Sequence, residues 1–262
     1  MTARPSFQIG GVRLDALAAH EVSERVAMWA SAGSPPPRTV AFVNAFSIVA
    51  AGRDPGFLGA LNDIDLSVVD GVPVAWVGGH MTGLTCERLS GPDLMHALLS
   101  EPEHAHLKHF IYGGTHEALE RIEFRYNRGG TLKPQRIVGT HCPPFRDMTP
   151  EEEQAFERRI HALEPDILWV CLGTARQEKW MIAMRDRLRI PVMAGVGAAV
   201  DFLSGQKPRA PRWMQRAGLE WLFRLATEPR RLWRRYLIGN VLFLRLAFLE
   251  VWRHHQTRRQ QA

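Results

Sequence analysis

Residues 165–180 read PDILWVCLGTARQEKW, and the pattern in this stretch decides the fold that we expect. A short apolar run, typical of a buried strand, meets a turn of small residues, and the turn leads into a charged segment with helical character. Such a turn is either an ordinary strand-to-helix connection or a loop that binds a phosphorylated ligand. The stretch alone leaves both interpretations open.

The same order of apolar run, turn and helical segment recurs across residues 39–205. Further buried strands are predicted at TVAFVN, DLSVVDG, KHFIYGG, QRIVGTHC and IPVMAGVG. Strands that alternate with helices indicate an α/β fold, Rossmann-like and doubly wound, with a mainly parallel sheet. Ligands of such folds lie beyond the carboxyl ends of the strands. The candidate residues are therefore Asn44, 70–71, 113–115, 173–177 and 195–197.

Local signals predict several other elements. Residues 7–12 (FQIGGV) indicate a short hairpin, and residues 14–31 an amphipathic helix. Residues 45–64 have helical spacing that Asp54-Pro55 interrupts, which predicts two short helices. Thr149 is a predicted N-cap, because Pro150 and three glutamates follow it in the first turn.

The composition is that of a folded soluble protein with one or two domains. The chain has 262 residues, of which 45% are hydrophobic and 23% charged. Its three cysteines are far apart and in no metal-ligand spacing, which favours a reducing compartment and disfavours a zinc site. The first residues contain no apolar run long enough for a signal peptide, so a cytoplasmic location is expected.

The positive charge is concentrated at the C-terminus. Residues 207–262 contain 13 Lys and Arg against 3 Glu, a net charge of +10, so the first 206 residues carry −4 of the total +6. We therefore expect an α/β catalytic domain over residues 1–206 and a basic segment over residues 207–262. An anionic partner, either a nucleic acid or a membrane surface, suits such a segment.

The basic segment is also rich in Leu, Trp, Phe and Tyr. Its apolar stretches are too short to span a bilayer. They predict a basic amphipathic helix in the membrane interface, with Trp233 and Trp252 near its ends. A core helix and a nucleic-acid-binding arm are the alternatives. The membrane surface is favoured, because the aliphatic and aromatic content exceeds what an arm that follows phosphates requires.

Glycine-rich turns indicate a phosphorylated ligand of a particular kind. No GxGxxG follows the first strand and no GxxxxGK[ST] occurs, which disfavours a dehydrogenase and a P-loop nucleotide hydrolase. Gly113-Gly114-Thr115 would place free N–H groups at a helix N-terminus, where a phosphate binds well, although an ordinary turn explains it equally. The similar turn at Gly173 to Gln177 favours a ligand with a diphosphate, such as a nucleotide sugar.

Two charged residues are candidates for the chemistry. Asp70 follows a buried strand and is either a general base for a hydroxyl nucleophile or an Asx-turn or helix cap. Arg88 either neutralises a phosphate or forms a surface ion pair with Glu87 or Asp93. His80, His116 and His141 have no spacing that indicates a metal site or a triad.

Four segments together resemble the WecG/TagA/CpsF glycosyltransferases: DLSVVDGVPVAWVGG, ERLSGPDLM, PDILWVCLGTARQEKWM and residues 190–237. The resemblance covers residues 39–237. It implies transfer of a sugar from a UDP-sugar to a lipid-linked acceptor, with inversion and with neither metal nor cofactor. Such enzymes act at the cytoplasmic face of the bacterial inner membrane, on undecaprenyl-diphosphate-linked intermediates of teichoic acid, enterobacterial common antigen or exopolysaccharide.

The family's functional residues map onto this chain one by one. The resemblance implies that Asp70 is the base and that Arg88 and Gln177 match the ER(V/L)(T/S)G and G(S/T)xxQE motifs. Phe42 and Pro92 depart from the commoner Thr and Ser, which concerns donor and acceptor selection. The candidate substrate-binding residues are Asn44, Arg88, Gly114, Thr115, Gly173, Gln177, Arg224, Arg231 and Arg234.

The three C-terminal arginines are spaced by seven and three. On a continuous helix Arg224, Arg231 and Arg234 would share one face, although Pro229 allows a helix start or a kink between them.

The leading interpretation of the whole sequence is a peripheral-membrane hexosyltransferase with a UDP-sugar donor and a polyprenyl-diphosphate-linked saccharide acceptor, without a nucleic-acid partner. The donor sugar would be glucose, N-acetylmannosamine or its uronic acid. A nucleic-acid-binding α/β protein is the alternative.

Overall fold

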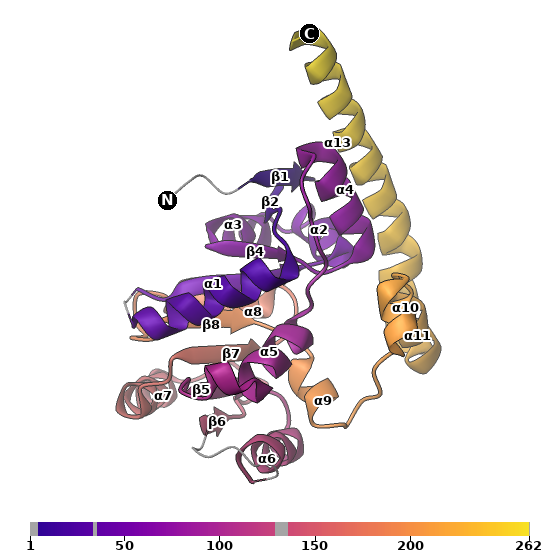
Figure 1. The fold of residues 1–262 in the computed structure, drawn as a ribbon. Coiled ribbons are helices and arrows are strands. Elements are labelled where there is room, and N and C mark those ends of the chain that lie inside the picture. The colour runs from indigo at the N-terminus through magenta and orange to yellow at the C-terminus, as the bar shows by residue number, and fades with distance from the viewer. Residues whose placement is uncertain (1–4, 34–35, 129–135, 262) are drawn as a thin grey trace. The chain divides into compact units, whose positions relative to one another are not determined.

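The computed structural model describes residues 5–33, 36–128 and 136–261 and shows an α/β fold (Figure 1). Six strands form one parallel sheet in the order β4-β3-β8-β7-β5-β6. Both the Rossmann-like class and the C-terminal helical region predicted from the sequence are confirmed. The strands are β3 Arg38–Val43, β4 Leu66–Val69, β5 His109–Gly113, β6 Ile137–His141, β7 Ile167–Cys171 and β8 Val192–Gly195.

The chain divides into two compact units, which are described separately. Unit 1 contains Met1–Ala19, Phe42–Ser90 and Arg209–Ala262, and unit 2 contains His20–Ala41 and Gly91–Pro208. The C-terminal basic segment therefore belongs to the same unit as the N-terminal hairpin and the predicted base. The division at residue 206 remains a prediction about function.

Unit 1 begins with the predicted hairpin. Its strands β1 Ser6–Ile9 and β2 Val12–Asp15 are joined by Gly10 and Gly11, whose φ angles of 58° and 82° suit a tight turn. The prediction that a helix starts at residue 14 is wrong, because Leu14 and Asp15 belong to β2. The Asp15 carboxylate accepts a hydrogen bond from the Ser67 backbone N–H (2.8 Å), which holds this segment against β4. Helix α1 begins only at Ala19 and runs to Ala32.

Three short helices complete the first half of unit 1. The predicted interruption at Asp54-Pro55 is confirmed: α2 spans Ala45–Ala51, α3 spans Pro55–Asp63, and the Asp54 carboxylate caps α3 by accepting from the Phe57 N–H (3.0 Å). Helix α4, Val72–Thr82, follows β4.

The C-terminal segment folds as a chain of helices. They are α10 Arg212–Arg216, α11 Glu220–Thr227, α12 Pro229–Trp233, a π-helical turn η3 Arg234–Ile238 and α13 Gly239–Gln261. Glu228, at φ −130° and ψ 57°, lies between α11 and α12 and breaks the helix. The helix start that Pro229 allows is confirmed, since α12 begins there. Arg224 and Arg231 therefore lie on different helices, and the condition for a shared face is not met.

Helix α13 has apolar residues on two faces. Helix α13 is the long yellow helix of Figure 1. Its residues Phe243 and Ala247 are buried where it packs along α2 and α4. The simple amphipathic helix expected from the sequence is thus corrected, because the face away from this packing is apolar as well. Its exposed apolar residues are Val241, Leu244, Phe248 and Trp252.

Unit 2 holds the centre of the sheet between helices. These are α1 with α5 Gly91–Ser100, α6 His116–Glu123, α7 Pro150–Leu163, α8 Arg176–Met184 and α9 Ala199–Leu203. The predicted N-cap of α7 is confirmed: Thr149 accepts from the Glu152 N–H, and the Glu152 side chain accepts from the Thr149 N–H. This capping box fixes the start of α7.

One histidine lies fully inside the core of unit 2. His109 is 0% exposed, and its Nδ1 accepts a hydrogen bond from Trp169 Nε1 (3.1 Å). Burial, with a smaller effect of the nearby Arg136 charge, lowers the pKa of His109 to about 3 from its ordinary 6.5. The imidazole is therefore neutral in the folded protein at all physiological pH values.

We expect His109 to make the protein less stable as the pH falls. Between pH 6.5 and about 3 the unfolded chain takes up a proton that the folded chain does not. The free energy of unfolding then decreases by up to about 1.4 kcal/mol per pH unit from this group. His109→Asn keeps an acceptor for Trp169 and should flatten the dependence by about that slope in urea unfolding between pH 7 and 4. An unchanged slope would contradict a neutral His109; His20→Asn, at an exposed position, is the control.

We expect Gly113→Ala to destabilise the protein. Gly113 has φ 107°, and a Cβ there would lie 2.5 Å from the carbonyl oxygen of Cys171. Strain of this kind costs on the order of 1–3 kcal/mol. The control is Gly59→Ala in α3, where nothing lies within 4 Å of the added atom, and a gain of up to about 1 kcal/mol is expected. Thermal unfolding measures both, and equal effects of the two substitutions would refute the steric explanation.

Candidate functional site

The predicted base lies at the carboxyl end of β4 in unit 1. Asp70 is anchored by its backbone N–H, which donates to the carbonyl of Val43 at the end of β3 (2.9 Å). Its carboxylate oxygen Oδ1 is 3.7 Å from Nε of Arg88. The structure thus brings together the two charged residues that the sequence singled out. Glu87, one of the alternative partners considered for Arg88, accepts a hydrogen bond from the Ala19 N–H (2.9 Å).

Arg88 also contacts the C-terminal segment. Its Nη2 donates to Oε2 of Glu220, the first residue of α11, at 2.6 Å. Oε1 of Glu220 lies 3.8 Å from Nε of Arg209, whose Nη2 donates to Ser90 Oγ (2.9 Å). Neither Glu220 nor Arg209 was predicted from the sequence as a site residue. Both stand inside the long C-terminal block that carries the family resemblance, but nothing in their spacing indicates their partners.

Asn44 has a structural role at the neighbouring strand end. Its side-chain oxygen accepts from the N–H (3.2 Å) and the hydroxyl (3.3 Å) of Ser47, and so caps α2. A Cβ on Gly71 would lie 3.9 Å from the Asn44 Cβ, which shows that the ends of β3 and β4 are side by side. A substrate contact of Asn44 remains a prediction.

The arginines of the C-terminal segment differ in their surroundings. Arg231 is paired with Glu228 and its side chain is 63% exposed, while the exposed Arg234 lies over the ring of Trp233 (5.1 Å). Arg224 is half-buried. Their contact with a substrate remains a prediction for all three.

Arg235, which is not among the predicted site residues, is half-buried and lies against an aromatic ring. Its guanidinium carbon lies 3.9 Å from the centroid of the Phe46 ring, within cation–π range. Burial lowers its pKa, and the charges of Arg224 and Arg231 act in the same direction while Asp70 opposes them. Its buried Nε has no hydrogen-bond partner among the described residues. A half-buried guanidinium whose Nε–H lacks a hydrogen-bond acceptor is well suited to an anionic ligand.

Unit 2 contains both glycine turns of the candidate site. Gly113 and Gly114 have φ angles of 107° and 94°, and Thr115 caps α6 by accepting from the Ala118 N–H (3.2 Å). Gly113 pairs with Cys171 across β5 and β7, so this turn adjoins the one that begins at Gly173. The expectation that both turns lie at one edge of the sheet is confirmed.

Gln177 is buried and holds two strand ends together. Its Nε2 donates to the carbonyl of Gly195 (3.0 Å) and to Glu178 (2.8 Å), and its Oε1 accepts from the Gly197 N–H (3.0 Å). Both amide hydrogens are therefore used within the protein, and a ligand contact of Gln177 stays a prediction. Gly173 has φ 84° with open space around it. The backbone at Gly173 is therefore accessible, whereas the side-chain amide of Gln177 is occupied.

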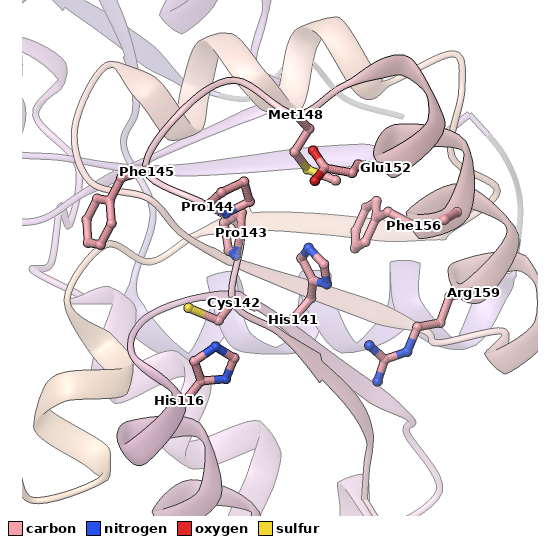
Figure 2. Close-up of a pocket in the computed structure, with 11 residues that line it drawn as sticks. His116, His141, Cys142, Pro143, Pro144, Phe145, Met148, Glu152, Phe156 and Arg159 are labelled. Carbon is pink, nitrogen blue, oxygen red and sulfur yellow. The ribbon is translucent and has the colours of Figure 1, made fainter.

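A pocket of about 660 Å³ opens beside the Gly113–Thr115 turn. Figure 2 shows Cys142 at its edge, and its Sγ donates to the Gly114 carbonyl (3.1 Å). His141 lines the pocket, and burial, with the charge of Arg159, lowers its pKa. The pocket is mainly apolar with a few polar groups, as ligand pockets commonly are. Its lining is His116, His141, Cys142, Pro143, Pro144, Phe145, Met148, Glu152, Ala155, Phe156 and Arg159.

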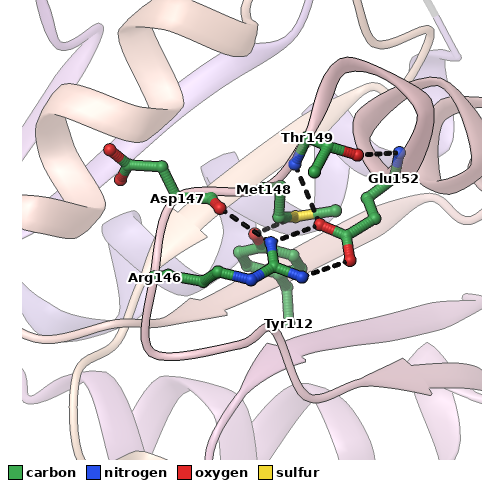
Figure 3. A network of polar contacts seen from close by, with 6 residues as sticks. All are labelled: Tyr112, Arg146, Asp147, Met148, Thr149 and Glu152. Carbon is green, nitrogen blue, oxygen red and sulfur yellow. Dashed lines mark hydrogen bonds and ion pairs between the residues drawn. The ribbon is translucent and has the colours of Figure 1, made fainter.

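An ion-pair network shapes one wall of this pocket (Figure 3). Arg146 donates to both carboxylate oxygens of Glu152 (2.7 Å each), and Glu152 also accepts from the Thr149 N–H (2.9 Å). The bond from Arg146 is the main reason that the pKa of Glu152 is lowered to about 2. Met148, between them, accepts from the Tyr112 hydroxyl (3.3 Å). The segment from Arg146 to Glu152 is thus held against the sheet.

Among the described residues, one group brings three possible metal ligands together. Glu101, Glu103 and His104 form it at the end of α5, where both glutamates are exposed. None of the predicted site residues belongs to this group.

No helix in the described part of the chain is both long enough and apolar enough to cross a bilayer.

Comparison with known proteins identifies a family for this chain. The model of the glycosyl transferase WecG/TagA/CpsF family matches residues 7–257, which is nearly the whole chain. The match includes the Asp70–Arg88 pair, both glycine turns and the arginine-rich helices. The chain belongs to the WecG/TagA/CpsF family and is a glycosyltransferase of cell-surface polysaccharide synthesis.

Proposed function

We propose that the protein transfers a hexosyl residue from a UDP-sugar to a polyprenyl-diphosphate-linked saccharide, with inversion at the anomeric carbon and without a metal ion. The observation that carries this proposal is the carboxylate of Asp70 next to arginines in unit 1, with Arg88 at 3.7 Å and Arg235 in electrostatic range. A base and several cations are the groups that such a transfer requires.

The reaction needs a proton acceptor and a stabilised leaving group. Asp70 takes the proton of the acceptor hydroxyl, the oxygen attacks the anomeric carbon, and the bond from that carbon to the UDP phosphate breaks. UDP leaves with an additional negative charge. Arg88 and the C-terminal arginines Arg224, Arg231, Arg234 and Arg235 stabilise this charge in place of a metal.

Donor binding is the role that we assign to the turns of unit 2. The backbone N–H groups at Gly114, Thr115 and Gly173 suit the two phosphates, since a helix N-terminus attracts anions. The adjoining pocket of about 660 Å³ has room for the nucleoside, with His141 as a polar contact. Glucose, N-acetylmannosamine and its uronic acid are the candidate sugars.

Because the proposed acceptor is lipid-linked, we assign the enzyme to the cytoplasmic face of the bacterial inner membrane, and the exposed apolar face of α13 supports contact with a membrane. Apolar side chains of this face enter the interface, while arginines of the same segment meet lipid phosphates. The same observation disfavours the alternative of nucleic-acid binding, because a row of exposed aliphatic and aromatic side chains does not serve contact with phosphates.

A donor screen tests the overall proposal. Purified protein is incubated with each UDP-sugar and a synthetic polyprenyl-diphosphate saccharide, and release of UDP is followed in buffer with excess EDTA. We expect one donor to give acceptor-dependent UDP release that EDTA does not reduce. Loss of activity with EDTA that Mg²⁺ or Mn²⁺ restores would refute the metal-free mechanism.

We expect Asp70→Asn to lower turnover by about 10²–10⁴-fold, the usual contribution of a general base. Binding of UDP, measured by calorimetry, should stay near that of the unchanged protein, because Asp70 is assigned the proton of the acceptor and no contact with the donor. The control is Asp63→Asn on the exposed end of α3. Full turnover of Asp70→Asn at saturating acceptor would make Asp70 a structural residue.

We expect Val241→Glu with Phe248→Glu to weaken binding to vesicles that contain phosphatidylglycerol by at least about tenfold. Both side chains are exposed on α13, and each apolar side chain of this size contributes roughly 1.5–3 kcal/mol when fully buried. Vesicle sedimentation measures the effect, and Met28→Glu on α1 is a control for an exposed apolar residue elsewhere. Unchanged sedimentation together with salt-sensitive retention on RNA or DNA would favour the alternative.

A further inference from the structure

Glu220 lies between two arginines next to the proposed base. It is 2.6 Å from Nη2 of Arg88 and 3.8 Å from Nε of Arg209, and the side chains of Glu220 and Arg88 are only 21% and 18% exposed. Arg88 in turn has its Nε 3.7 Å from Asp70. A row of alternating charges therefore runs from the end of β4 to the first turn of α11.

The contact leaves Arg88 able to bind a further anion. A guanidinium has five N–H donors in a rigid plane. Nη2 is engaged by Glu220 and Nε faces Asp70, and neither contact involves Nη1. Because two carboxylates on different elements fix the plane of the group, the direction of the Nη1 donors is fixed as well. A phosphate contact through Nη1 then needs no rearrangement of Arg88.

The position of Glu220 on α11 has a simpler partial explanation. A carboxylate in the first turn of a helix is stabilised by the helix dipole. That effect does not require Arg88, which is 132 residues away in the chain. The helix dipole therefore does not explain the short ion pair between Glu220 and Arg88.

We propose that Glu220 is a positioning residue that holds Arg88 in its phosphate-binding orientation beside Asp70, and so connects the C-terminal segment to the chemistry. This inference rests on the proposed function. If it holds, the C-terminal segment contributes a carboxylate to the reaction in addition to its arginines.

A double-substitution cycle tests the coupling. The activities of Arg88→Ala, Glu220→Ala and the double variant are compared as kcat/KM for the donor that the screen identifies. We expect Glu220→Ala to lose about 10- to 100-fold, the range for one hydrogen bond to a charged group. The double variant should be no worse than Arg88→Ala alone. Losses that multiply would show independent roles and overturn the inference.

Further variants separate positioning from folding. Glu220→Asp keeps the charge and should recover part of the activity, whereas Glu220→Gln should recover less. Glu250→Gln in α13 removes a carboxylate paired only at 3.5 Å with Arg253 and should keep full activity. Thermal unfolding of every variant is measured. If Glu220→Ala merely lowered the folded fraction, it would show full kcat/KM at a temperature where all variants are folded, and that result would overturn the inference.

The remaining outcomes distinguish this inference from the proposed function. If Arg88→Ala itself retains full transfer, the proposed role of Arg88 fails. If Arg88→Ala is impaired while Glu220→Ala is not, only the positioning role of Glu220 fails. A lower KM for the donor in Glu220→Ala would mean that the carboxylate of Glu220 competes with the phosphate for Arg88. This result would also overturn the inference.

Discussion

The parallel sheet leaves charged groups no place except the strand ends. All residues of β4, β5 and β8 are buried, so a charged side chain within these strands would lose its hydration without a partner. His109 illustrates the rule, since it is tolerated in β5 as a neutral ring bonded to Trp169. Asp70, Gly114 and Gly173 all follow strands directly, where backbone and side-chain groups become accessible. The location of the candidate site is a consequence of this constraint.

Within each unit, different forces hold the functional groups. In unit 2 they are hydrogen bonds of the backbone: Gln177 links the ends of β7 and β8, and Thr115 caps α6. In unit 1 they are charges, with Glu220 between Arg88 and Arg209. The contrast fits the proposed roles, because a phosphate-binding turn requires a rigid backbone, whereas proton transfer and a departing diphosphate require charges.

The two faces of α13 explain why one segment can serve two purposes. Phe243 and Ala247 pack inside unit 1 and give the helix a fixed place in the fold. Val241 and Phe248 remain exposed on the face away from this packing and are available to a bilayer. The candidate arginines and Glu220 precede this helix on shorter elements, so the groups proposed to act on the substrate are separate from those proposed to contact lipid.

The sequence by itself determined the elements and their class. The hairpin at residues 7–12, the interruption at Asp54-Pro55 and the cap at Thr149 depend on signals a few residues long, and the alternation of strands and helices predicted the sheet. Asp70 became a candidate because it follows a strand and matches a motif, and Arg88 because its charge suits a phosphate and it matches a motif; their roles stay predictions. The start of α1 was misplaced, since Asp15 pairs with Ser67 from another part of the chain. The tertiary structure alone decided that Arg235 is enclosed by Phe46 and that Glu220 pairs with Arg88. Local patterns contain no information about such partners, because a contact across 132 residues exists only after the intervening chain has folded.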